Sequence, residues 1–262
     1  MEPVLVDRRD ALAIVTINRA ERRNALDAEA KVALREALAA VAEDDGVRAV
    51  VLTGSGGHFC AGQDLKGHAR TLEEEGPEAT FATVADDYVP VIRSLTTMSK
   101  PVVAAIEGAC VSAGLGIALA CDLRVVATSA SFATAFSAIG LTTDSGLAYT
   151  LPRMVGDAKA RELVLLGESF SGEQAHAWGL VARLTQGGGA LEQATELGSR
   201  LAAGPTAAYA ESKALLAATW DHSLDETMQV EAEAQLRAGS TEDHQLAVKA
   251  FLAKERPVFS GR

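Results

Sequence analysis

One segment, VVLTGSGGHFCAGQDLKG at residues 50–67, constrains the fold of this chain more than any other. It begins as an apolar run that predicts a buried strand, continues through a glycine-rich turn and then enters a helix. A junction of this kind leaves backbone N–H groups available to an anion or to a polarised oxygen. We therefore expect a ligand to bind where this strand ends.

A second junction with the same organisation follows at residues 102–122, VVAAIEGACVSAGLGIALACD. There a strand meets small residues before a helix that is apolar nearly all round. Two such turns that face each other form an oxyanion hole, which is a pair of N–H groups that stabilises negative charge on a substrate oxygen.

The glycines of these turns do not match the motifs of nucleotide-binding or hydrolase sites. GSGGHF lacks the GxGxxG spacing, and Leu119 stands where the second turn would need Gly or Ala. Neither turn is followed by Gly-Lys-Ser or Gly-Lys-Thr, and the sequence has no GxSxG. The turns are therefore expected to bind another kind of ligand.

Strand and helix patterns alternate through the first part of the chain, which predicts an α/β fold with a mostly parallel sheet. Asp27 is a candidate N-cap for a helix whose Leu34, Leu38 and Val41 share one face. The polar stretch at 66–87 is expected to be a mobile loop or a loosely packed helix. We expect strands at 4–7, 12–18, 47–53, 101–106 and 123–127, and further helices at 88–98 and 113–121.

From residue 156 onward helical patterns dominate the sequence. They occur at residues 172–178, 190–202, 206–219, 224–238 and 242–253. The three glycines at 187–189 are a linker signal. We therefore predict a domain boundary there, between an α/β part at residues 1–188 and an alanine-rich helical region at 189–262.

Composition and charge exclude several classes of function. The net charge of −11 and the absence of a basic run argue against binding to nucleic acid. The longest apolar stretch, residues 109–121, is too short to span a bilayer. The three cysteines lack the spacing of metal ligands, so we expect buried thiols, a reducing compartment and no metal site. The first residues lack a signal-peptide pattern, which predicts a cytoplasmic protein.

With these motifs in view, the chain resembles the enoyl-CoA hydratase/isomerase (crotonase) superfamily. The resemblance implies a spiral of ββα units, with an acyl-CoA site in residues 1–188. It also implies that the helical region assembles the protein as a homotrimer or as a dimer of trimers. The resemblance is carried in order by NRAERRNAL at Asn18, FCAGQDL at Phe59, EGACVSAGLGIALACD at Glu107, FSAIGLTTDSGLAYTLPRMVG at Phe136 and AFLAKERPVFSGR at Ala250.

The resemblance also implies how an acyl-CoA thioester would bind. Its carbonyl oxygen would lie between the backbone N–H groups of Gln63 and Ala113, each of which contributes about 3 kcal/mol to stabilising an enolate. Coenzyme A would enter as part of the substrate, with no prosthetic group and no metal ion. Its contacts are implied at Arg23, Ala25, Ala61, Asp64 and Leu65.

Two of these residues, Arg23 and Asp64, could have a role other than binding coenzyme A. Arg23, with its neighbour Arg22, either approaches the coenzyme phosphates or is simply solvated ahead of a helix. Asp64 is either a catalytic acid or the N-cap of the helix that follows, and the cap is favoured.

The carboxylate residues at the catalytic positions indicate which members of the family this chain resembles most. Hydratases of the family use two glutamates, and Gly116 and Phe136 stand at those positions here. Asp144 in TDSG remains as the candidate base, which suits a proton shift within a bound acyl group. The surrounding sequence is most similar to the ring-epoxide isomerases of phenylacetate breakdown, although Thr143 and Leu147 depart from their pattern.

Alternatives remain open at this point. Asp144 could instead cap a helix that begins near Gly146, and Asp86 or Asp87 could bring a second carboxylate into the pocket. The leading hypothesis is therefore an acyl-CoA isomerase. An enoyl-CoA hydratase is the second hypothesis, and a non-catalytic acyl-CoA-binding subunit is the third.

Overall fold

The main sheet is built from strands that the sequence largely predicts. The computed structural model describes residues 2–262. The strands β1 and β2 form an antiparallel hairpin, and every later neighbour in this sheet pairs in parallel. The sheet has the order β1-β2-β3-β4-β6-β9, formed by Val4–Arg9, Leu12–Ile17, Ala49–Gly54, Val102–Ile106, Leu123–Ala127 and Arg183–Thr185.

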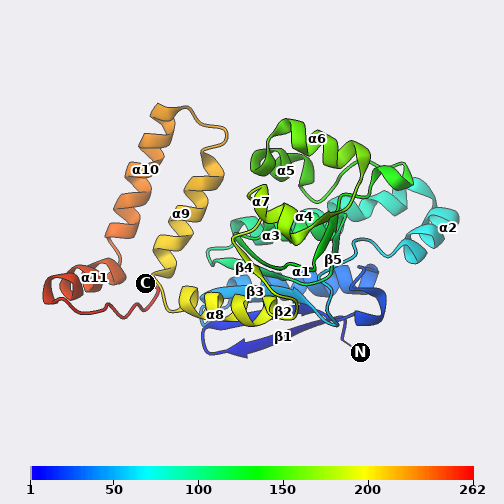
Figure 1. The fold of residues 1–262 in the computed structure, drawn as a ribbon. Coiled ribbons are helices and arrows are strands. Elements are labelled where there is room, and N and C mark those ends of the chain that lie inside the picture. The colour runs from blue at the N-terminus through cyan, green and yellow to red at the C-terminus, as the bar shows by residue number, and fades with distance from the viewer. Residues whose placement is uncertain (1) are drawn as a thin grey trace.

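Both faces of this sheet are covered, as the continuous apolar runs predict. Val50 and Leu52 of β3 face a core that includes helix α1, Ala28–Glu43, whereas Val51 faces α8, Ala190–Ala202. Figure 1 shows α8 lying along the sheet, where it contacts β3, β4 and β6. Asp27 caps α1 as predicted, because its side chain accepts a hydrogen bond from the Ala30 N–H at 2.9 Å.

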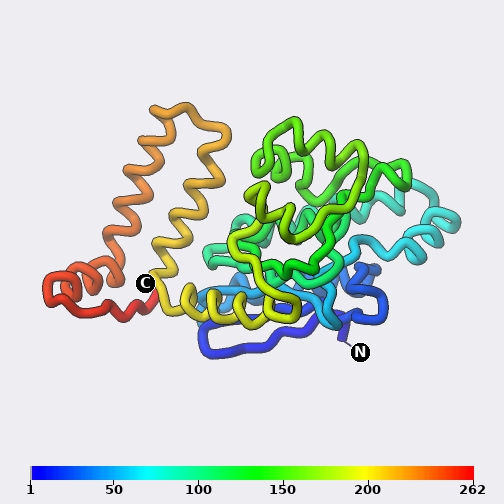
Figure 2. The backbone as a smooth tube through the Cα atoms, in the orientation of Figure 1, coloured from blue at the N-terminus to red at the C-terminus, as the bar shows by residue number. Residues whose placement is uncertain are grey.

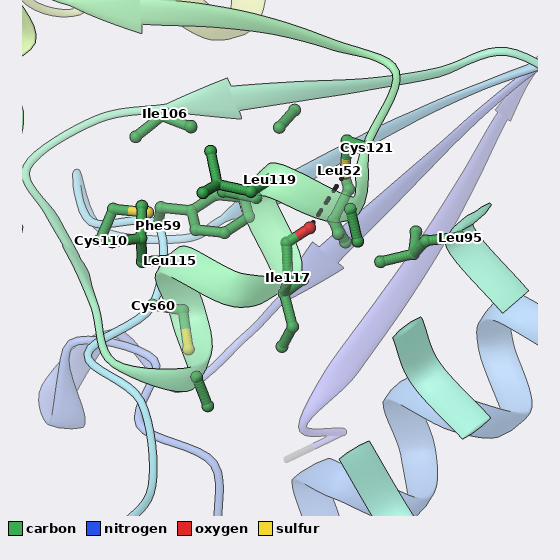
Figure 3. Close-up of a cluster of buried hydrophobic side chains, with 14 of the residues drawn as sticks. Leu52, Phe59, Cys60, Leu95, Ile106, Cys110, Leu115, Ile117, Leu119 and Cys121 are labelled. Carbon is green, nitrogen blue, oxygen red and sulfur yellow. Dashed lines mark hydrogen bonds between the residues drawn. The ribbon is translucent and has the colours of Figure 1, made fainter. Parts of the chain in front are cut away.

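A second, smaller sheet was not predicted from the sequence. It consists of β5, Ala109–Val111, β7, Ser131–Ala133, and β8, Phe170–Ser171. Its strands are only two or three residues long, so they show too little alternation to be recognised. Helix α4, Ala113–Ala120, is buried at every residue, and Figure 3 shows its Leu115, Ile117 and Leu119 among the other core side chains.

The polar stretch at 66–87 is helical, which confirms the helix interpretation over the loop. Helix α2, Leu65–Thr83, is interrupted at Gly76, whose φ is 83°, directly before Pro77. The π-helical turn η2, Val84–Tyr88, joins α2 to α3, Val89–Thr97. Three further helices follow, α5, Leu147–Val155, α6, Asp157–Leu166, and α7, Gly172–Ala177; α5 packs against α4 and α6, and α7 contacts β8. Helix α6 had no prediction from the sequence.

The last helices leave the core as a separate arm. Helices α9, Thr206–Ala218, and α10, Leu224–Gly239, form a hairpin, and α11, Glu242–Ala253, follows it. Figure 2 shows this hairpin standing away from the body of the molecule. Lys213 of α9 joins it to the core through an ion pair with Asp122 at 2.9 Å. The predicted boundary at residue 188 stays a prediction, but α8 belongs to the layer that covers the sheet.

The arm carries many apolar side chains that remain exposed in the single chain. They are Leu216, Trp220, Leu224, Met228, Leu236, Leu246, Val248, Phe251 and Leu252. Such a concentration of exposed apolar surface is typical of a protein interface. Among residues 2–262, no helix is both long and apolar enough to cross a membrane.

Candidate active site

The two glycine-rich turns lie side by side, as the sequence suggested. The Cys60 N–H donates to the Ala109 carbonyl at 3.0 Å, and the Val111 N–H donates to the Cys60 carbonyl at 2.9 Å. Gly62 permits this approach, since its φ is +86° and a Cβ there would lie 2.9 Å from the Ser112 Cβ. A larger residue at 62 would therefore push the two turns apart.

The direction of the Gln63 N–H follows from a hydrogen bond on the other side of the same peptide. The Leu26 N–H donates to the Gly62 carbonyl at 2.7 Å. Because a trans peptide directs its C=O and N–H to opposite sides, the Gln63 N–H faces away from Leu26. Within residues 2–262, no protein group accepts a hydrogen bond from this N–H.

Within the described part of the chain, the Ala113 N–H is left without a hydrogen-bond partner for a different reason, its position at the start of a helix. Ala113 is the first residue of α4, so its N–H has no partner inside the helix. The preceding Ser112 has a φ of 50° and a ψ of −122°, a strained backbone conformation of the kind that collects at functional sites. The Ser112 hydroxyl donates to the Thr134 carbonyl at 2.9 Å, which helps to hold the strained residue in place.

A cavity of about 280 Å³ opens where these two N–H groups lie. Gln63, Ala113 and Asp144 all line it. Asp144 is the one carboxylate of residues 2–262 on its wall. Most of the remaining wall is apolar and comes from Leu65, Phe81, Val84, Phe136, Ile139 and Leu141. The structure thus brings together the predicted donors and the predicted base on one largely apolar cavity.

Asp144 is partly buried, and its Oδ1 accepts a hydrogen bond from the Ser145 hydroxyl at 2.7 Å. Burial raises the pKa of Asp144 above its usual range, and the Ser145 hydroxyl only partly offsets this rise. Helix α5 has Gly146 as its N-cap and receives no side-chain cap. The alternative that Asp144 caps this helix is therefore wrong, and its carboxylate remains available to a ligand.

Gly116 lies under the loop that carries Asp144. A Cβ at Gly116 would lie 2.5 Å from the Cβ of Ser145 and 2.6 Å from the Ser145 carbonyl oxygen. Both distances are far below normal contact separations of about 3.5–4.0 Å. A glutamate at 116 would therefore displace the loop, so packing as well as sequence keeps a second carboxylate away from this position.

Comparisons with known proteins agree with this geometry. A family model described as enoyl-CoA hydratase/isomerase matches residues 7–262. The 1,2-epoxyphenylacetyl-CoA isomerase of Escherichia coli (strain K12) is 37% identical over 263 residues, which cover 100% of both chains. The chain belongs to the enoyl-CoA hydratase/isomerase family.

Other members of the family are also similar to this chain over nearly its whole length. Crotonyl-CoA hydratase of Syntrophomonas wolfei is 29% identical, with 98% of each chain covered. A solved structure from Mycobacterium abscessus, named for enoyl-CoA hydratase/isomerase, is 43% identical and has a TM-score of 0.95. It covers 99% of this chain and 100% of its own. The crotonase-like fold predicted from the sequence is confirmed.

The coenzyme contacts expected from the family lie beside the cavity. Ala61 and Leu65 line it directly. Arg23 is exposed, and its carbonyl accepts a hydrogen bond from the Ala61 N–H at 3.0 Å. The carbonyl of Ala25, which is half-buried, accepts a hydrogen bond from the Arg19 guanidinium. The roles of these residues in binding coenzyme A stay predictions.

Asp64 is an N-cap, as the sequence favoured. Its Oδ1 accepts hydrogen bonds from the N–H groups of Lys66 at 3.0 Å and Gly67 at 3.3 Å. Burial raises its pKa, but these two hydrogen bonds and the nearby Arg19 outweigh burial and hold the pKa below its usual range. A carboxylate that stays ionised in this way is poorly suited to act as a catalytic acid.

Asp86 and Asp87 do not line the cavity that contains Asp144. They face a neighbouring cavity of about 400 Å³. Asp87 accepts a hydrogen bond from the Thr83 hydroxyl at 2.7 Å and lies 3.4 Å from the Lys31 Nζ. The alternative that one of them supplies a second carboxylate therefore has no support from their positions.

Several residues of the site had no individual role predicted from the sequence, although the stretch 66–88 was expected to line the pocket. Tyr88, Phe81 and His68 line the cavity from segment 65–88, and the Tyr88 hydroxyl donates to the Gln63 side chain. Asn24 is fully buried and donates to the Ser55 and His58 carbonyls at 2.9 and 2.7 Å, which fixes the first turn. The aromatic residues within a polar stretch were the one available signal. In the described part of the chain, no three His, Cys, Asp or Glu side chains gather as a possible metal site.

Proposed function

We propose that this member of the enoyl-CoA hydratase/isomerase family is an acyl-CoA isomerase that uses Asp144 as its base. The thioester carbonyl binds between the N–H groups of Gln63 and Ala113. The Asp144 carboxylate removes a proton from the acyl group, and the electron pair moves to the carbonyl oxygen to form an enolate. Protonated Asp144 then returns the proton to another carbon, so the product has the mass of the substrate.

The observation that carries this proposal is a cavity with one carboxylate and two unpartnered N–H groups. Addition of water requires acid and base groups that hold the water and transfer its proton. Asp144 stands alone on the wall of this cavity among residues 2–262, and the loop over Gly116 leaves no room for a glutamate. One base beside an oxyanion hole suffices for a proton shift.

In this proposal, the two N–H groups stabilise the enolate, and the burial of Asp144 makes its carboxylate more basic. Each preorganised donor contributes about 3 kcal/mol to stabilising the developing oxyanion, or roughly a hundredfold in rate. The raised pKa of Asp144 makes its carboxylate a stronger base than a solvated one. The same group, once protonated, can still give the proton back to the enolate.

The acyl group is proposed to be unsaturated or ring-bearing. Phe81 and Phe136 give the cavity flat apolar walls that suit a planar group. The full-length similarity to a 1,2-epoxyphenylacetyl-CoA isomerase supports ring isomerisation within this class. Coenzyme A is part of the substrate, and the reaction needs no prosthetic group.

The oligomer is proposed to be a homotrimer or a dimer of trimers built through the helical arm, residues 206–253. The exposed apolar side chains of this arm support an assembly in which they become buried. Sedimentation equilibrium of the full chain measures the mass of the assembly. A monomer at micromolar concentration would contradict this part of the proposal.

Product analysis tests the reaction directly. Purified protein is incubated with a 3-enoyl-CoA, a 2-enoyl-CoA and epoxyphenylacetyl-CoA, and the products are followed by mass spectrometry and NMR. A product of unchanged mass with a moved double bond or a rearranged ring is expected. A gain of one water would instead support the hydratase hypothesis. That hypothesis is the second candidate because some relatives are named as hydratases.

Binding of every ester without any conversion would instead support the third hypothesis, the non-catalytic acyl-CoA-binding subunit. In that outcome the oxyanion hole would serve recognition alone. The isomerase proposal would then be wrong even though the ligand class is right.

A further inference from the structure

Tyr88 makes a contact that the proposed reaction does not use. Its side chain lines the cavity, and its hydroxyl donates a hydrogen bond to the side-chain Oε1 of Gln63. Gln63 is also the residue whose backbone N–H forms half of the oxyanion hole. The contact therefore joins segment 84–88 to the catalytic turn.

The position of Tyr88 is firmly fixed. Its side chain is 2% exposed, and it ends the π-helical turn η2, a form of helix that is frequent at functional sites. Its neighbour Asp87 is held by Thr83 and Lys31. Burial raises the pKa of Tyr88 far above its usual range, and negative charge on nearby groups adds to the rise, so the hydroxyl keeps its proton and stays a donor.

Gln63 brings a backbone donor and a side-chain acceptor to the same cavity. Its backbone N–H, like that of Ala113, has no acceptor within residues 2–262, and its side-chain carbonyl is an acceptor beside the same apolar cavity. Leaving donors and acceptors unpaired in such surroundings is costly. A Gln63 carbonyl without another partner would turn toward these N–H groups and take the place of the thioester oxygen.

We propose that Tyr88 is a positioning residue that holds the side-chain carbonyl of Gln63 out of the oxyanion hole. The inference rests on the proposed function, because it needs the two N–H groups to bind a thioester carbonyl. It adds a residue that keeps the site open before substrate arrives. Within residues 2–262 the side-chain hydrogen bond of Tyr88 goes to Gln63 and not to the base, so Tyr88 acts through Gln63.

A double-mutant cycle tests this inference with Tyr88→Phe, Gln63→Met and the double variant. Methionine is similar in length to glutamine and keeps the backbone N–H, but it has no carbonyl that can enter the hole. The readouts are kcat, KM and the dissociation constant of a saturated acyl-CoA, butyryl-CoA, measured by titration calorimetry. Gln63→Leu replaces Gln63→Met if the methionine variant does not fold.

We expect Tyr88→Phe to raise KM and the dissociation constant about fivefold, the size of one lost hydrogen bond, with a smaller change in kcat. In the Gln63→Met background the same substitution should change neither value. Tyr149→Phe is the matched control, because Tyr149 is 45% exposed and lies outside the cavity. We expect it to behave like the wild type.

Two results would overturn the inference while leaving the proposed function intact. One is a Tyr88→Phe variant with wild-type binding. The other is an equal loss in both backgrounds, which would mean that Tyr88 supports the wall independently of Gln63. If the wild-type protein itself binds no acyl-CoA, the proposed function fails first and the inference falls with it.

Discussion

Replacing Gly116 by alanine tests whether the packing of α4 sets the position of the base. The new Cβ would lie 2.5 Å from the Ser145 Cβ and 2.6 Å from its carbonyl oxygen. Since atoms in contact settle at about 3.5–4.0 Å, either α4 or the loop must retreat by about 1 Å. Helix α4 is buried along its whole length, so we expect the loop to move and to carry Asp144 with it.

The expected effects differ between stability and catalysis. Overpacking a core costs about 1–3 kcal/mol of unfolding free energy. A base displaced by about 1 Å costs about a hundredfold in rate. We therefore expect Gly116→Ala to lower kcat about a hundredfold, with KM nearly unchanged because the two N–H groups stay in place.

The assay combines steady-state isomerisation of a 3-enoyl-CoA with urea unfolding of the same preparation. Gly239→Ala in α10 is the matched control, because a Cβ there meets no atom of the same chain within 4 Å and Gly239 lies outside the cavity that contains Asp144. It should keep the wild-type kcat. A Gly116→Ala variant with wild-type kcat and wild-type stability would show that the site has room for a side chain, and it would remove the packing argument against a glutamate.

Two other predictions follow from individual contacts. Because Asp144 must be ionised to act and burial raises its pKa, kcat/KM should fall as pH falls through a value above the ordinary carboxyl range. Ser145→Ala should move this acidic limb of the pH–rate profile still higher, since the lost hydroxyl stabilises the ionised form; a limb that moves lower would contradict the assignment of the base. Asn24→Ala should cost about 2–4 kcal/mol in urea unfolding, because four hydrogen bonds of a buried side chain are lost. A loss below about 1 kcal/mol would mean that the turn is held by other contacts.

The parts of the fold that the sequence predicts are those with local signals. The hairpin, the buried strands and α1 follow from apolar periodicity and from the Asp27 cap. Helices α8 and α11 have the predicted bounds, 190–202 and 242–253. The second sheet escaped prediction because its strands, β5, β7 and β8, are only two or three residues long and show too little alternation.

The residues of the site also divide into those that the sequence predicts and those that it does not. The resemblance to the family implied Gln63, Ala113 and Asp144 through motifs that are contiguous in the sequence, and the structure places them on one cavity. Tyr88 and the packing of Gly116 against Ser145 depend on residues 25 and 29 positions away in the chain. Periodicity and spacing carry no information about such contacts, which only the folded chain brings together.

The most direct test of the central claim, that Asp144 is the single base of an isomerase, is the Asp144→Ala variant. Isomerisation of a 3-enoyl-CoA is measured under single-turnover conditions, and butyryl-CoA binding is measured by calorimetry on the same sample. The account predicts that isomerisation is lost while binding survives, because the N–H groups of Gln63 and Ala113 remain. Isomerisation at the wild-type rate in this variant would contradict it.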